Sequence, residues 1–180
     1  MMSAKKTMRR TTLISTFVGA LLLAACAETS LPVSHSTPSP VLYRNLEATT
    51  SQLDLQNAAG IISAYRKLKG LGPVVVDPAL VLLAQNHATA QAKADKVGHS
   101  VGGAFRKRVR ALEDRRGSSV ENVSAGYRSF AQAFSGWRGS KAHNANLLNK
   151  KVTRMGIAKA VNPSSKFKVF WTLVMTSEPL

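Results

Sequence analysis

Three polar side chains in this 180-residue sequence stand in contexts that a hydrophobic core does not need. His99 comes just after the end of a predicted helix, Glu121 opens the tripeptide Glu-Asn-Val, and His143 closes the segment WRGSKAH. Two neutral imidazoles can hold a divalent cation such as zinc, and a nearby carboxylate can orient a ligand or a bound water. These residue types favour a polar binding site, provided that the fold brings them together.

The elements that must position these residues are predicted from hydrophobic periodicity. Helices are expected over about 53–69, 78–96, 105–116 and 129–139, and strands over 155–161 and 167–175. Asp77 is a suitable capping residue before Pro78, and the charges of the third helix are expected to face solvent. Because the expected helices precede the expected strands, we predict an α+β fold in which helices cover an antiparallel sheet.

The N-terminus has the layout of an export signal. Basic residues precede an apolar run from Leu13 to Ala25, which is shorter than the ~20 residues that a membrane-spanning helix needs. Residues 23–26, Leu-Ala-Ala-Cys, resemble the bacterial lipobox, in which the cysteine receives the lipid. Cys26 is the only cysteine, so no intramolecular disulfide can form. Acyl chains such as palmitate on Cys26 would hold the protein on a membrane.

The chain is therefore expected to have three parts. Residues 1–25 are the signal peptide, residues 26–50 are the lipidated cysteine and a Ser-, Thr- and Pro-rich tether, and residues 51–180 are one domain. This organisation predicts an extracytoplasmic protein anchored in a bacterial cell envelope. Ala27, rather than an aspartate, follows Cys26, which favours the outer membrane if the organism has two membranes.

The charge balance restricts the expected partners. The chain carries 25 Lys and Arg against 9 Asp and Glu. Removal of residues 1–25, which hold four of the basic residues and none of the acidic ones, lowers the formal charge from +16 to +12. In an envelope such a charge favours phospholipid headgroups, lipopolysaccharide phosphates or wall polymers over nucleic acid. A basic solvated surface without a dedicated ligand explains the charge equally well.

Several segments together resemble a known family. These are the stretch from Ile62 to Ser100, ENVSAG at 121–126, the Trp-x-x-Ser-x-x-His stretch with Asn-Leu-Leu after it, Met-Gly-Ile at 155–157, and a last strand with Trp171. In this order they look like the CAP superfamily of cysteine-rich secretory, antigen 5 and pathogenesis-related 1 proteins, in its bacterial SCP-like branch. The resemblance covers about Leu55 to Thr176 and implies a three-layer α-β-α sandwich with a small antiparallel sheet and a central cleft.

The same resemblance implies which residues lie in the cleft. By motif, the two cleft histidines are His99 and His143, and the acidic residue is Glu121. Ser140 stands where many eukaryotic members have a second glutamate, which weakens both metal binding and acid–base chemistry. The disulfides of those members are also absent, so packing must stabilise the domain.

Three functions remain open at this point. The first is a non-enzymatic module that binds a lipid-like small ligand or an anionic envelope surface, and we favour it. The alternative is a metal-dependent hydrolase, with zinc on His99 and His143 and with Glu121 as general base. The third is a purely structural envelope protein. In that case the two histidines hydrogen-bond across the cleft, Glu121 and Asn122 stabilise a turn, and His87 is a core or edge histidine.

Overall fold

The computed structural model of the protein describes residues 40–112 and 117–177. Five α-helices, four strands and a short 3-10 helix appear in this part of the chain. The helices are α1 (Leu55–Lys67), α2 (Pro78–Ala94), α3 (Phe105–Arg110), α4 (Phe130–Gly139) and α5 (Lys141–Leu147), and the 3-10 helix is η1 (Val41–Tyr43). The strands are β1 (Val75–Val76), β2 (Ser119–Ala125), β3 (Arg154–Val161) and β4 (Val169–Thr176).

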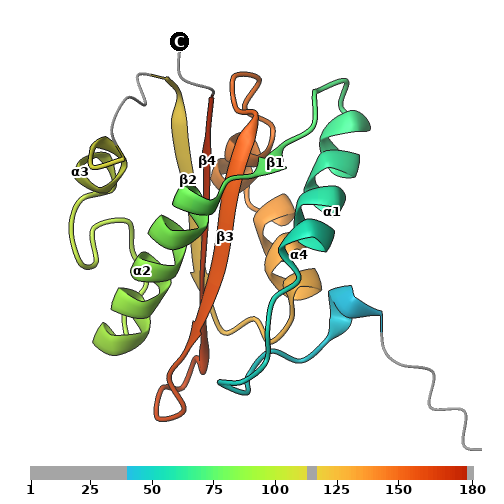
Figure 1. The fold of residues 1–180 in the computed structure, drawn as a ribbon. Coiled ribbons are helices and arrows are strands. Elements are labelled where there is room, and N and C mark those ends of the chain that lie inside the picture. The colour runs from blue at the N-terminus through green and yellow to red at the C-terminus, as the bar shows by residue number, and fades with distance from the viewer. Residues whose placement is uncertain (1–39, 113–116, 178–180) are drawn as a thin grey trace, which may run out of the picture. The chain divides into compact units, whose positions relative to one another are not determined.

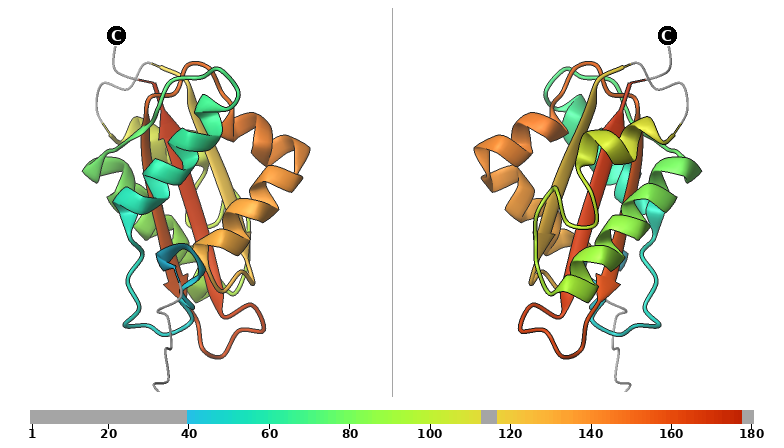
Figure 2. Two further views of the ribbon diagram at one scale, coloured as in Figure 1. Left: turned by 90° about the vertical axis from the view of Figure 1, so that its right-hand side faces the viewer. Right: turned by 90° about the vertical axis from the view of Figure 1, so that its left-hand side faces the viewer.

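The elements form three layers around one sheet (Figures 1 and 2). The strand order is β1-β3-β4-β2, with β4 antiparallel to both of its neighbours and β1 parallel to β3. Side chains alternate across the sheet, so Leu173 packs on the side of α1 and α4, while Val174 packs on the side of α2 and α3. The α+β class and the three-layer arrangement expected from the sequence are confirmed.

Helix α2 lies directly on β3, and a glycine of the strand marks the closest approach. Asp77 caps the helix, because one carboxylate oxygen accepts hydrogen bonds from Ala79 N at 2.8 Å and Leu80 N at 3.2 Å. Gly156 of β3 makes the close approach, since a Cβ at this position would lie 2.0 Å from the backbone carbon of Leu80. The glycine therefore fixes the distance between helix and sheet.

Four elements differ from the sequence-based expectation. β1, β2 and α5 were not predicted, and α3 ends at Arg110, with residues 113–116 outside the described chain. Leu46 is 3% exposed and belongs to the main core, so packing on the domain begins before residue 50, where the tether was expected to end. The predicted signal peptide, Cys26 and the tether up to residue 39 lie outside the described residues.

None of the helices within residues 40–112 and 117–177 is both long enough and apolar enough to cross a bilayer.

Candidate functional site

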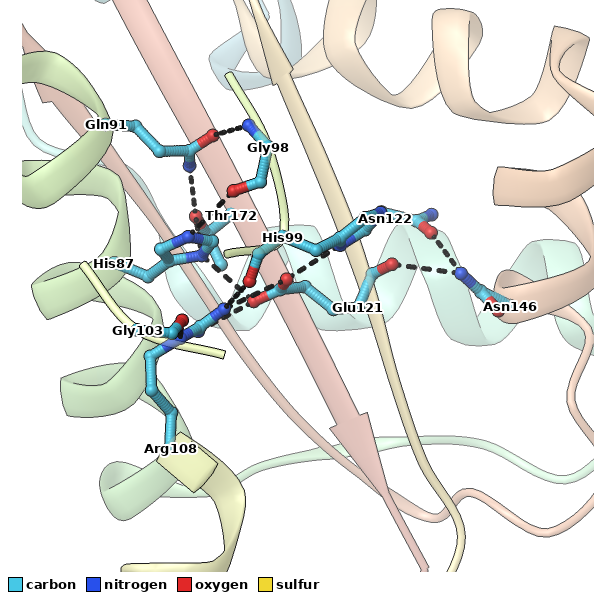
Figure 3. Close-up of polar contacts among 10 residues, drawn as sticks. All are labelled: His87, Gln91, Gly98, His99, Gly103, Arg108, Glu121, Asn122, Asn146 and Thr172. Atoms are coloured by element: carbon cyan, nitrogen blue, oxygen red, sulfur yellow. Dashed lines mark hydrogen bonds and ion pairs between the residues drawn. The ribbon is translucent and has the colours of Figure 1, made fainter. Parts of the chain in front are cut away.

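Glu121 is the centre of a buried polar cluster at the middle of β2 (Figure 3). Its side chain is only 1% exposed. One carboxylate oxygen lies 2.9 Å from His87 Nδ1 and the other lies 2.8 Å from His99 Nδ1. Arg108 donates to both oxygens, at 2.9 Å and 3.2 Å. Nitrogen atoms from three separate segments therefore converge on one carboxylate.

Helix α2 holds the loop that carries His99. His87 and Gln91 are four residues apart and so lie on the same face of the helix. His87 Nε2 lies 3.2 Å from the carbonyl oxygen of Gly98, and Gln91 Oε1 accepts from Gly98 N at 3.2 Å. Gln91 Nε2 also donates to Thr172 Oγ1 of β4 at 3.0 Å. Both main-chain groups of the residue before His99 are thus held by buried side chains of α2.

Arg108 of α3 holds the same loop from its other side. Besides Glu121, its guanidinium donates to the carbonyl oxygens of His99, at 2.8 Å, and Gly103, at 3.0 Å. Gly103 has a φ of +121°, a backbone conformation that residues other than glycine rarely adopt. The glycine lets the loop turn its carbonyl towards Arg108, and the arginine joins the loop to the sheet.

The hydrogen bonds favour the ionised form of Glu121. Burial by itself would raise the pKa of this carboxyl, because a charge is poorly solvated inside a protein. Hydrogen bonds from His87, Arg108 and His99 outweigh the burial, and the pKa of Glu121 lies below its ordinary value. Such a carboxylate is a weak proton acceptor near neutral pH.

His143 is positioned by a second set of contacts on the other face of β2. Asn122 donates through Nδ2 to the carbonyl oxygen of His143 at 3.1 Å. Asn146 donates to Asn122 Oδ1 at 2.9 Å and to the carbonyl oxygen of Glu121 at 3.0 Å. These contacts join α5, which carries His143, to the strand that carries Glu121.

The exposed imidazole of His99 and the half-buried imidazole of His143 influence each other electrostatically. The side chain of His99 is 55% exposed, and its Nδ1 is occupied by Glu121. Burial lowers the pKa of His143, and the Coulombic interaction with His99 lowers it further. A lowered pKa favours the neutral ring, which is the form that can bind a metal.

A catalytic zinc centre uses three protein ligands. Within the described residues no group of three His, Cys, Asp or Glu side chains is arranged to hold a metal ion. His99 and His143 are the imidazoles available, while both oxygens of Glu121 already accept hydrogen bonds. The residues present therefore do not fit a three-ligand catalytic zinc.

The sequence was next compared with protein families. The model of the cysteine-rich secretory protein family, CAP, matches residues 60–175. The chain belongs to this family. A comparison with curated proteins finds no match.

Solved structures with this CAP fold come from several bacteria. An extracellular SCP-domain protein of Bacillus anthracis superposes with a TM-score of 0.59 at 21% identity, covering 69% of this chain and 40% of that one. An outer surface protein of Borrelia burgdorferi gives a TM-score of 0.61 at 16% identity, and the match covers 71% of this chain and 98% of that one. A cysteine-rich secretory protein of Staphylococcus aureus gives a TM-score of 0.53 at 23% identity, and the match covers 69% of this chain and 38% of that one. The chain thus spans well under half of the first and third proteins.

The CAP domain brings His99 and Glu121 into direct contact, and His143 lies within the electrostatic reach of His99. The predicted turn is wrong, because Glu121 and Asn122 lie in β2 and face opposite sides of the sheet. His87 is buried, as a core histidine should be, but it also contacts Glu121.

The sequence analysis missed two further site residues. Arg108 was assigned to the solvent-facing charges of its helix, yet its side chain is 14% exposed and binds Glu121. Gln91 was not singled out, although its side-chain amide joins α2 to Gly98 and Thr172. The four-residue spacing of His87 and Gln91 on one buried helix face was the signal available for the α2 side of the site. No comparable signal separates Arg108 from the neighbouring bases at 106–110.

Proposed function

We propose that this protein is a lipid-anchored CAP-domain module of a bacterial cell envelope that binds a ligand without transforming it. The anchor would be Cys26, and the support for it is the lipobox-like segment at 23–26 with the basic and apolar residues before it. The relatives from Bacillus and Borrelia, described as extracellular and outer surface proteins, are consistent with an extracytoplasmic location. Ala27 favours the outer membrane in an organism that has one.

The observation that carries the binding role is the saturation of Glu121. A general base needs an oxygen free to take a proton and a pKa near the working pH. Glu121 accepts from His87, His99 and Arg108 through both oxygens, and its pKa is lowered. The arrangement favours a role for Glu121 in fixing the position of His99. It favours the role of general base in a zinc hydrolase less.

The charge at the site favours an anionic ligand. Arg108 and the two contacting histidines surround the carboxylate of Glu121, and Ser140 stands at the start of α5, where many relatives carry a second acid. The carboxylate that contacts His99 is therefore already paired with Arg108, and His99 and His143 remain as nitrogen donors for a ligand. An anionic lipid headgroup fits both these donors and the +12 charge of the chain without residues 1–25.

Calorimetry can test the binding role. Short-chain phosphatidylglycerol, kept below its micelle concentration, would be titrated into the full chain, with the corresponding phosphatidylcholine as the zwitterionic control. We expect saturable binding of phosphatidylglycerol that weakens at least tenfold in the His99→Ala, His143→Ala double variant. Equal binding of the two lipids, or binding that the double variant retains, would overturn the proposal.

A second experiment addresses the hydrolase directly. Wild type and the double variant would be incubated with zinc and a panel of ester, amide and phosphoester substrates. We expect no turnover above that of free zinc. Zinc-dependent turnover that disappears in the double variant would establish the enzyme instead.

The anchor is tested separately by mass spectrometry and fractionation. The chain produced in a bacterium with a lipoprotein pathway should begin at Cys26 and carry the mass of its acyl chains. Cys26→Ser should release it from the membrane fraction. A Cys26 without lipid mass would contradict the anchor and leave the binding test unaffected.

A further inference from the structure

A groove lies along β3 on the edge of the sheet, away from the polar cluster at Glu121. Its volume is about 750 Å³. One wall is the α2 stripe that includes Gln85, Thr89 and Lys93, and the other wall is formed by the chain between Thr49 and Leu55. The floor is β3 from Ile157 to Val161. Cavities of this size accommodate small ligands or several residues of a peptide.

The floor of the groove is an incompletely paired strand edge. β1 pairs with β3 only at Arg154 and Met155, so the described ladder on this side ends there. In Figure 1, β1 lies beside one end of β3, and the remaining length of β3 runs on towards the hairpin with β4. The sheet therefore has an edge of about five residues between its two walls.

The main-chain direction along β3 follows from the bonds to β1. Thr153 and Met155 accept hydrogen bonds from the segment of β1 through their carbonyl oxygens, at 2.9 Å and 2.8 Å. Alternate residues of a strand direct their main-chain groups to the same edge, so Lys159 and Val161 direct theirs into the groove. The carbonyl of Lys159 accepts from the exposed side chain of Gln85 at 3.2 Å. A side-chain amide thus occupies the place that a strand's N–H would take.

The far wall is attached to β3 by Lys159. Its ammonium donates to the carbonyl oxygens of Leu46 and Ala48, each at 2.9 Å. The segment that leads into the wall is therefore held at the strand, and the side chains of Ala158 and Ala160 leave room above the floor. This geometry suits an extended chain more than a compact ligand.

The charge of the groove indicates the chemistry of its occupant. Lys93 and Lys159 line it, and none of the described lining residues is an aspartate or glutamate. A second copy of this chain is disfavoured, because each copy carries a charge of +12 after removal of residues 1–25. We propose that an extended peptide segment with carboxylate side chains, from a partner protein, adds to the edge of β3 in this groove by main-chain hydrogen bonding.

Peptide selection followed by affinity measurement tests this proposal. A displayed library of random heptapeptides would be selected on the full chain, and the enriched peptides would be labelled and measured by fluorescence polarisation. We expect acidic peptides with alternating β-branched residues. Gln85→Trp, which fills the groove from α2, should weaken them at least tenfold. Asn86→Trp, at an exposed position of the same helix outside the groove lining, is the matched control and should leave the affinity unchanged.

Two further measurements separate strand addition from charge attraction. The peptide nitrogens would be methylated one at a time. Methylation should abolish binding only at every second residue, because a strand directs every second N–H to its neighbour. Lys93→Gln should weaken acidic peptides severalfold and leave their neutral analogues unchanged. No enriched peptide, enriched peptides that bind Gln85→Trp as well as wild type, or methylation effects without alternation would each overturn the proposal. These readouts do not involve His99 or His143, so they are independent of the lipid experiment.

Discussion

Arg108 binds the carboxylate of Glu121 through two nitrogens, at 2.9 Å and 3.2 Å, although the two residues lie in different elements. The guanidinium pairs with the carboxylate at the centre of the cluster and also holds the carbonyl oxygens of the loop that carries His99. A two-nitrogen pair of this kind sets orientation as well as charge. The site of this CAP domain therefore depends on an arginine from a short basic helix.

Arg108→Met should destabilise the domain markedly. The variant leaves Glu121 buried without its strongest cation, and breaking such a pair costs about 3 kcal/mol or more. Urea unfolding followed by circular dichroism measures the loss. Arg106→Met, at an exposed position of the same helix, should change the free energy of unfolding by less than about 0.5 kcal/mol. Equal losses in the two variants would show that Arg108 is an ordinary surface base.

The lowered pKa of Glu121 gives stability a defined pH dependence. A carboxyl whose folded pKa is lowered stabilises the fold above its unfolded pKa of about 4.3, and this contribution disappears as the pH falls through the folded pKa. The difference in the free energy of unfolding between wild type and Glu121→Gln should therefore be largest near pH 6 and shrink towards pH 3. Glu47→Gln, in the more exposed pair with Arg128, is the control and should show a much smaller dependence.

His143 should titrate below the ordinary histidine pKa of about 6.5. Burial and the Coulombic interaction with His99 both disfavour its protonated form. NMR titration of the ring protons measures this pKa, and His99→Ala should raise it part of the way back. Because the unfolded chain binds this proton more readily, stability falls as the pH drops through about 6.5. An unchanged pKa of His143 in His99→Ala would show that the two rings are not coupled.

The elements that the sequence predicted correctly are those in which apolar residues occupy the buried positions. In α4, Phe130, Ala133, Phe134 and Trp137 recur at helical spacing and are all buried, so periodicity alone located the helix. β2 carries Glu121 and Asn122 at its buried centre instead of apolar residues. Its pattern makes sense only with the partners supplied by α2, α3 and α5, which lie elsewhere in the chain.

The same reason separates the predicted site residues from the missed ones. His99, Glu121 and His143 stand out because such residue types are conspicuous at element ends and in motifs. Arg108 is one of several bases in a row, and only the folded chain shows that its side chain turns inward. Sequence patterns therefore indicated the conspicuous polar residues of the candidate site, whereas the residues that position them depend on tertiary contacts.

Gly156→Ala should separate α2 from β3. The added Cβ would lie 2.0 Å from the backbone carbon of Leu80, and neither backbone can yield without moving the helix. Overpacking of this kind costs about 1–3 kcal/mol when the structure can adjust. We expect a loss at the upper end of this range or beyond it, measured by urea unfolding. Gly60→Ala, in α1, is the control. A Cβ added at this position would have no neighbouring atom within 4 Å, and alanine should stabilise the helix by about 0.5–1 kcal/mol.

Arg66 should prove important for stability although its hydrogen bonds go to main-chain atoms. The residue is 1% exposed, and burial lowers its pKa. Its guanidinium donates to the carbonyl oxygens of Gly72, Leu147, Asn149 and Val152, at 2.8–3.0 Å. Leu147 ends α5, so the positive charge also lies at the negative end of that helix.

Arg66→Met fills much of the same volume but leaves these buried carbonyls without their donor, at a cost of about 1–3 kcal/mol for each group that water cannot reach. We expect the largest loss of stability among these variants, together with faster amide hydrogen exchange in α5, which carries His143. Lys67→Met, at the exposed neighbouring position of α1, should change neither quantity. Normal exchange in α5 of Arg66→Met would show that Asn122 and Asn146 suffice to hold this helix against β2, and that Arg66 stabilises only the loop after it.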